Sequence, residues 1–105
     1  GIVAAAKSVT VVSDMTLKNK IRDFDSVLDK IDKLNPFYFY YKGDEPDNVY
    51  GGLSDQELLT VYPEFVRYLD DNYSVDYGSL TTCIAIRGIQ ELLERIEQLE
   101  QKLSA

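Results

Sequence analysis

A chain of 105 residues is long enough to build one domain and too short to build two with separate cores. Eighteen acidic against eleven basic residues give a net charge of −7, so no basic face is available for phosphates, which excludes nucleic acid and anionic membranes as partners. Because the chain contains no histidine and a single cysteine, Cys83, we expect no metal site, no cofactor and no internal disulfide.

The first twelve residues differ from the rest of the chain. Residues 1–6 are small and apolar, but they lack the charged start of a signal peptide and the length of a membrane span. Residues 8–12 are rich in β-branched side chains, which is typical of a short strand. We interpret this strand as the end of an upstream segment rather than as the opening of an independent fold.

Residues 17–34 show the spacing of an amphipathic helix. Apolar side chains recur every three or four residues, with Lys, Arg and Asp between them. The series consists of Leu17, Ile21, Phe24, Val27, Leu28, Ile31 and Leu34. We therefore predict an amphipathic helix that ends at Asn35-Pro36. One continuous helix and a helix broken near Asp23 both fit this pattern.

An aromatic run follows at residues 37–41, and the strand preference of these side chains predicts a β-strand. A polar loop at residues 43–48 and a second strand around Val49-Tyr50 complete a small hairpin. A stacking platform for bases is disfavoured by the acidic charge, and a calcium loop by the lack of regularly spaced ligands. We expect a solvated loop and an alternating strand that buries Phe37, Phe39 and Tyr41.

A capping box opens the next helix, because Ser54 is a preferred N-cap residue and Glu57 follows three positions later. The helix continues through the apolar residues Leu58, Leu59 and Val61. Pro63 is expected to start another helical turn over residues 64–68. Beyond it we expect a turn and then a short extended piece, at residues 70–72 and 73–77.

The last segment, residues 79–105, is predicted to form one long helix. Its apolar residues fall on positions a and d of a heptad, namely Ile89, Leu92, Ile96, Leu99 and Leu103. Arg95 at position g and Glu100 at the following e form a pair of opposite charges suited to bridging neighbouring helices. Two heptads make a short seam, so packing of this stripe on its own domain is an equal alternative. The charged ending favours a bundle of several chains.

Several short blocks stand in a characteristic order along the chain. Ser13-Asp14 is followed by Leu17-Lys18, and later come Gln56-Glu57, Tyr62-Pro63-Glu64, Val75-Asp76-Tyr77 and the glutamate-rich helix. In this order the blocks resemble the endosialidase-type intramolecular chaperones, a self-cleaving serine peptidase family found on phage tailspikes and tail fibres. The resemblance runs from Ser13 to about Leu103 and rests on the whole series rather than on any single block.

The sequence departs from the family pattern at two places. Lys20 stands where similar proteins usually have asparagine, although Asn19 is adjacent. Asp55 precedes Gln56-Glu57 where similar proteins have alanine. Neither change touches the serine or the lysine of the expected catalytic pair.

The resemblance implies autoproteolysis by a Ser/Lys dyad. Similar proteins cut the bond immediately before the serine, so Ser13 is expected to attack the carbonyl of Val12 while Lys18 takes its proton. A lysine acts as a base only when burial or a nearby cation lowers its pKa. The residues expected to support the dyad are Asp14, Asn19, Lys20, Gln56 and Glu57. Without the resemblance, Ser13 and Asp14 are ordinary helix caps and Lys18 is an ordinary surface lysine.

The resemblance also implies an architecture and a function. The expected fold is α+β and mostly helical, with a small β-hairpin and amphipathic helices, and with helix 79–105 in a trimeric coiled coil. Residues 1–12 are expected to end a β-rich parent fibre, and residues 13–105 to form the chaperone domain. As a homotrimer it would assist folding in the host cytoplasm and then be released, while the fibre joins the virion tail.

Two other functions stay open. One is a structural trimerisation domain of a phage fibre that does not cleave itself. The other is an acidic module that recruits a basic partner protein. The second explains the net charge but neither the spacing of Ser13 and Lys18 nor the C-terminal heptads, and it ranks last.

Overall fold

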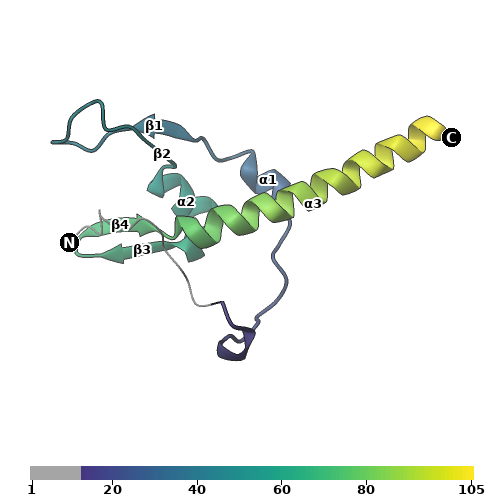
Figure 1. Cartoon of the computed structure of the whole chain (residues 1–105), viewed down its shortest axis with the longest axis horizontal. Helices are drawn as coiled ribbons and strands as arrows, with labels where there is room; N and C mark the ends of the chain where they lie inside the picture. The colour runs from purple at the N-terminus through teal and green to yellow at the C-terminus, as the bar shows by residue number, and fades with distance from the viewer. Residues whose placement is uncertain (1–12) are drawn as a thin grey trace.

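The computed structural model describes residues 13–105, which form an α+β domain dominated by one long helix (Figure 1). The helices are α1 (Leu28–Ile31), α2 (Asp55–Val61) and α3 (Tyr77–Ser104), with 3-10 turns at η1 (Met15–Leu17) and η2 (Pro63–Phe65). The strands are β1 (Phe37–Phe39), β2 (Tyr50–Gly52), β3 (Val66–Leu69) and β4 (Asn72–Val75). The predicted α+β class is confirmed. The strand predicted at residues 8–12 and the cleavage-site residue Val12 lie outside the described residues.

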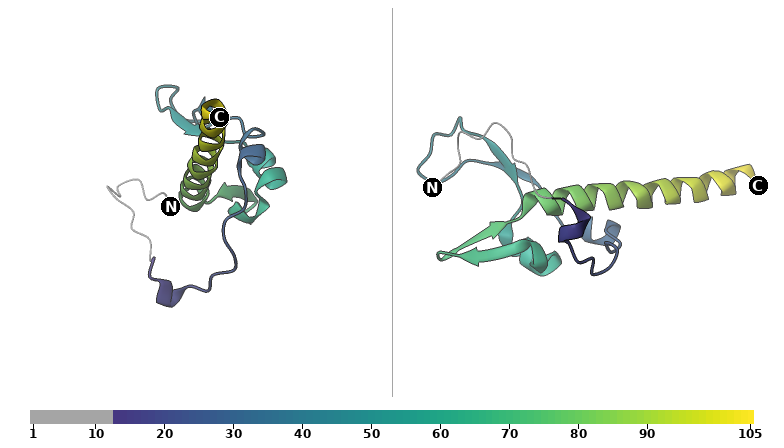
Figure 2. Two further views of the ribbon diagram at one scale, coloured as in Figure 1. Left: turned by 90° about the vertical axis from the view of Figure 1, so that its right-hand side faces the viewer. Right: turned by 60° about the horizontal axis from the view of Figure 1, so that its bottom comes forward.

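Helix α3 begins two residues before the predicted start and has two different halves. Asp76 caps it by accepting a hydrogen bond from the Ser79 N–H at 3.3 Å. The first half packs on the domain and buries Leu80 and Gly88. The second half projects past the other elements, and every residue from Leu92 onward is exposed (Figures 1 and 2). Among the helices of residues 13–105, none is long and apolar enough to cross a membrane.

A small core joins α2, α3 and the turn between α2 and β3. Leu58, Tyr62 and Leu80 form its centre and are at most 2% exposed. The ring of Phe24 stacks on Tyr62 with a centroid separation of 6.5 Å and lies 6.2 Å from the ring of Phe65. The core is therefore closed by an aromatic side chain from the segment that precedes α1.

The predicted hairpin at the aromatic run is confirmed as β1 and β2, with Phe37 opposite Gly52 and Phe39 opposite Tyr50. The predicted burial of its aromatic face is wrong for the single chain, because Phe37 is 46% exposed and Tyr41 is 58% exposed. The rings instead pack on one another, with Phe39 5.1 Å from Tyr41 and 5.7 Å from Tyr50. A two-stranded hairpin has no second layer to cover this face.

A second hairpin replaces the helical turn expected over residues 64–68. The turn that begins at Pro63 ends at Phe65 as η2, and the chain continues as β3, which pairs with β4. Asp70 and Asp71 both adopt positive φ, 51° and 62°, which is the backbone of the tight two-residue turn that matches strand twist. Aspartate tolerates this conformation. The turn expected at residues 70–72 therefore joins two paired strands, β3 and β4, as a hairpin.

The helix predicted over residues 17–34 is mostly absent, and only α1 is helical within it. Residues 13–27, which we call the arm, are irregular apart from η1, and Ile21 is 89% exposed. The arm swings away from the body before it returns at α1 (Figures 1 and 2). Tertiary contacts override the helical pattern, because Phe24 packs on the core and the segment after it bonds to α3.

Candidate functional site

The predicted catalytic pair lies together at the start of the arm. The Lys18 ammonium donates a hydrogen bond to Ser13 Oγ, with Nζ and Oγ 3.0 Å apart. This separation lies within the range over which a general base takes a proton from a hydroxyl. In the ammonium form the lysine is the donor, and loss of one proton would leave the amine able to accept from the same hydroxyl. Both side chains are exposed in the single chain.

A local turn produces this contact. The Asp14 carboxylate accepts a hydrogen bond from the Thr16 N–H at 2.9 Å and so caps η1. Within the turn, the Lys18 N–H donates to the Met15 carbonyl at 3.2 Å, which folds the chain back on itself. A single 3-10 turn therefore suffices to bring residues five positions apart into contact.

Asp14 is held in its charged form by this cap. Its pKa is lowered by the backbone N–H of Thr16 and, to a smaller extent, by the side chain of the same residue. The Asp14 carboxylate therefore stabilises the backbone of η1. Through this turn it helps to bring Ser13 and Lys18 together.

The cations nearest in sequence to the dyad are bound to acids further along the arm. The Lys20 ammonium lies 2.6 Å from the Asp23 carboxylate, and Arg22 lies 3.2 Å from the Asp25 carboxylate. Hydrogen bonding, then charge, from these partners lowers the pKa of Asp23 and of Asp25. The positive charges of Lys20 and Arg22 are therefore each paired with a carboxylate of the arm. Asn19, the other neighbour expected to support the dyad, is exposed.

Gln56 and Glu57 lie in the first turn of α2 and bond to groups other than the dyad. Ser54 Oγ accepts from the Glu57 N–H at 3.4 Å, which is the first half of the predicted capping box, and donates to Gln56 Oε1 at 3.0 Å. The Glu57 carboxylate accepts instead from the Asn35 amide at 2.8 Å. Glu57 therefore ties α2 to the loop that precedes β1, and Gln56 bonds within the start of α2.

Sequence reasoning missed one acidic residue, Glu91 of α3. Its two carboxylate oxygens accept hydrogen bonds from Ser26 Oγ and from the Val27 N–H, each at 2.6 Å. The Ser26 hydroxyl and then the Val27 N–H lower the pKa of Glu91, with a smaller contribution from Arg87 and Arg95. No local pattern announces this contact, because its partners lie 65 and 64 positions away.

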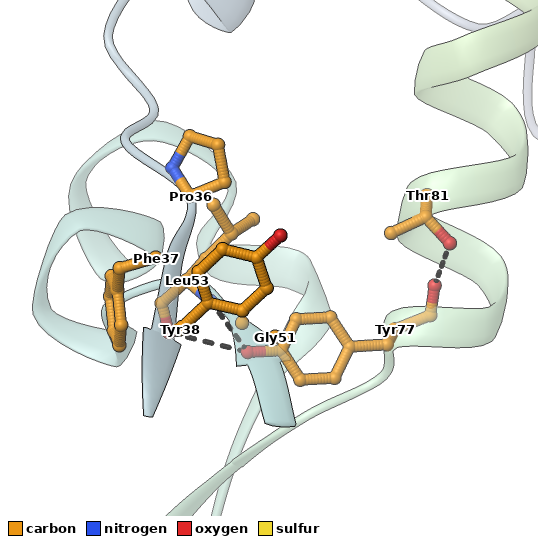
Figure 3. Close-up of a pocket in the computed structure, with 8 residues that line it drawn as sticks. Pro36, Phe37, Tyr38, Gly51, Leu53, Tyr77 and Thr81 are labelled. Atoms are coloured by element: carbon orange, nitrogen blue, oxygen red, sulfur yellow. Dashed lines mark hydrogen bonds between the residues drawn. The ribbon is translucent and has the colours of Figure 1, made fainter. Parts of the chain in front are cut away.

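An apolar cavity of about 560 Å³ opens where the first hairpin meets α3 (Figure 3). Tyr77 closes one side, where its hydroxyl accepts from the Leu53 N–H at 3.0 Å and donates to the Leu53 carbonyl at 3.2 Å. The other lining residues are Pro36, Phe37, Tyr38, Gly51, Gly52 and Thr81. With no carboxylate, amine or thiol in its lining, the cavity offers apolar contact rather than acid or base chemistry.

Comparison with known proteins matches residues 13–67 to a peptidase family described as the chaperone of endosialidase. The chain belongs to this family. The match begins at Ser13, includes Lys18 and covers more than half of the chain.

Curated relatives of this family member are phage fibre proteins. The long tail fiber proteins Gp37 of Enterobacteria phages K3 and T2 are each 29% identical over 105 residues, which covers 93% of this chain and 8% of theirs. A probable tail fiber protein of Escherichia phage Phieco32 is 32% identical over 103 residues, which covers 92% of this chain and 14% of the relative. The chain thus spans a small part of the length of these proteins.

Proposed function

We propose that this chain is an intramolecular chaperone that trimerises a phage tail fibre, assists its folding and then cuts itself away between Val12 and Ser13. The observation that carries the proposal is the 3.0 Å contact between Lys18 Nζ and Ser13 Oγ in a member of the chaperone of endosialidase family. The relatives that share this segment are fibre proteins of which it forms a small part. Upstream β-rich fibre of the same chain is therefore the proposed client.

The proposed cleavage is an acyl shift followed by hydrolysis. Lys18 as a neutral amine takes the proton of the Ser13 hydroxyl while Oγ attacks the Val12 carbonyl carbon. The C–N bond breaks, Lys18 returns the proton to the Ser13 nitrogen, and Val12 is left as an ester on Oγ. Water then hydrolyses this ester, which yields a Val12 carboxylate and a domain that begins with a free Ser13 amine. Nucleophile and carbonyl sit on adjacent residues, so no separate binding step is needed.

Assembly into a homotrimer is supported by the apolar surface that one chain leaves exposed. The seam residues of α3 are 49–86% exposed, namely Ile89, Leu92, Ile96, Leu99 and Leu103. The chain exposes 9203 Å², whereas a compact protein of 12.0 kDa exposes about 6,000 Å². Packing of three projecting helices would cover the stripe, with Arg95 of one helix beside Glu100 of the next.

The structural alternative without cleavage is favoured by the exposure of Ser13 and Lys18 in the single chain. The proposed reaction depends on surroundings of Ser13 and Lys18 that the assembled fibre would supply. The same requirement would delay cleavage until assembly is complete. In the proposed life cycle, the domain acts in the host cytoplasm during virion assembly, and the mature fibre belongs to the virion tail.

The test is expression of a whole parent fibre with Ser13 intact and with Ser13→Ala. The intact protein is expected to give a trimeric fibre and a separate domain, and the variant a trimeric fibre with the domain still attached. One lost surface hydroxyl has little effect on stability, so assembly is the internal control. Equal cleavage of both proteins would exclude Ser13 as the nucleophile, and an intact wild-type chain would favour the structural alternative.

A further inference from the structure

Both carboxylate oxygens of Glu91 accept hydrogen bonds from the arm. One oxygen accepts from Ser26 Oγ and the other from the Val27 N–H, each at 2.6 Å. Hydrogen bonds to an ionised acceptor are roughly twice as strong as neutral ones, and two from adjacent residues fix orientation as well as distance. Glu91 as a residue is half-buried, and its carboxylate joins α3 to a segment that is remote in sequence.

The local structure of the arm makes this contact necessary. Val27 is the N-cap residue of α1, and its side chain has no oxygen with which to satisfy the helix start. Its side chain is fully buried, so its N–H cannot turn to solvent without cost. Gly88, one turn before Glu91, lets α1 approach α3, because a Cβ there would lie 3.2 Å from the Ile31 side chain, which is closer than ordinary contact.

Between the dyad and this anchor the arm has few attachments to the body. Its ion pairs, Lys20 with Asp23 and Arg22 with Asp25, are internal to the arm. Phe24 packs on Tyr62 and Phe65. This contact places the ring of Phe24, but it does not fix the orientation of the backbone that carries it. The Glu91 contact is the point at which the backbone of the arm is fixed to α3.

We propose that Glu91 is a positioning residue that fixes the dyad-bearing arm to the assembly helix and so couples cleavage to trimer formation. In the heptad, Glu91 lies at position c, between Ile89 at a and Leu92 at d. These neighbours are 59% and 49% exposed in the single chain. Packing of the seam in a trimer fixes this turn of α3 relative to the other two chains, and through Glu91 it fixes the arm as well. The inference rests on the proposed cleavage.

The test compares cleavage rates of whole parent fibres. Glu91→Gln keeps the size of the side chain and removes the charge, and Glu94→Gln makes the same change one turn away at an exposed position. Cleavage by Glu91→Gln is expected to slow by about tenfold or more, as for loss of hydrogen bonds to a charged group, with the trimer retained in sedimentation. Glu94→Gln is expected to cleave at the wild-type rate.

A second variant distinguishes positioning from a general loss of stability. Ser26→Ala removes one partner from the arm side, and it is also expected to slow cleavage while the trimer persists. The double variant is expected to be no slower than the slower single variant, because both changes break one contact. In the Ser13→Ala background, hydrogen exchange at the Val27 amide is expected to accelerate with Glu91→Gln and to stay unchanged with Glu94→Gln.

The outcomes separate this inference from the proposed function. Suppose that the wild type is cut, and that the Glu91→Gln and Ser26→Ala trimers are cut at the same rate as the wild type. That result would overturn the coupling by Glu91 and leave the dyad proposal standing. If Glu91→Gln fails to assemble, the Ser26→Ala trimer decides by the same comparison. An uncut wild-type fibre would overturn both proposals.

Discussion

Lysine at Leu92 and Ile96 is expected to prevent assembly. The two side chains occupy the middle of the seam and are 49% and 51% exposed in the single chain. Full burial of such a side chain contributes about 1.5–3 kcal/mol, so burial of the remaining half contributes about 1 kcal/mol. Two positions in three chains then give about 6 kcal/mol per trimer, or about four factors of ten in the assembly constant. Three ammonium groups meeting at each layer add repulsion to this loss.

Sedimentation equilibrium of the 105-residue chain checks this expectation. The matched control is the pair Gln98→Lys and Gln101→Lys, which adds the same charges to the same helix at positions c and f. The wild type and the control are expected to have a trimer mass, and the seam variant a monomer mass. A monomeric wild type, or a trimeric seam variant, would refute the assignment of this stripe to assembly. A dimer would show that isoleucine at a with leucine at d sets the oligomeric state as it does in isolated parallel coiled coils.

Three further changes probe the dyad, the packing and the arm. Lys18→Ala and Lys18→Arg are both expected to abolish cleavage in gel assays of the parent fibre, since a guanidinium stays protonated; normal cleavage by the arginine variant would mean that no deprotonated base is needed. Gly88→Val is expected to lower the free energy of unfolding by about 1–3 kcal/mol in denaturant titrations, because the added methyl groups meet Ile31 and Val27; unchanged stability would contradict the close approach of α1 and α3. The depressed pKa of Glu91 means that the unfolded chain takes up the proton first, so the stability contributed by this contact is lost as pH falls below the ordinary value of 4.5. The protection of the Val27 amide against exchange, relative to an unfolded peptide at the same pH, is expected to fall over that range in the wild type and not in Glu91→Gln, and a wild-type protection that does not change with pH would count against the contact.

Local sequence patterns predicted the elements whose structure is decided locally. The strand preference of the aromatic run gave β1, the cap at Ser54 gave α2, and the long apolar repeat gave α3 with its start misplaced by two residues. The contact between Ser13 and Lys18 also lies within one turn. The family resemblance was nevertheless needed to choose it over an ordinary cap beside a surface lysine.

The failures occur where distant residues decide the structure. The apolar spacing of residues 17–34 fits a helix, but Phe24 is drawn to the core and Val27 to Glu91, so only α1 remains. Residues 64–68 were assigned to a helical turn because Pro63 starts one, whereas pairing with β4 takes over after Phe65. The aromatic face of the first hairpin was expected to be buried, and the single chain has no layer to bury it.

The most direct test of the proposed function is the intact mass of the small fragment released from a whole parent fibre. A fragment that begins with the free amine of Ser13, with a matching fibre that ends at the Val12 carboxylate, is the predicted result. An unprocessed chain after prolonged incubation as a trimer, or a fragment cut at any other bond, would contradict it.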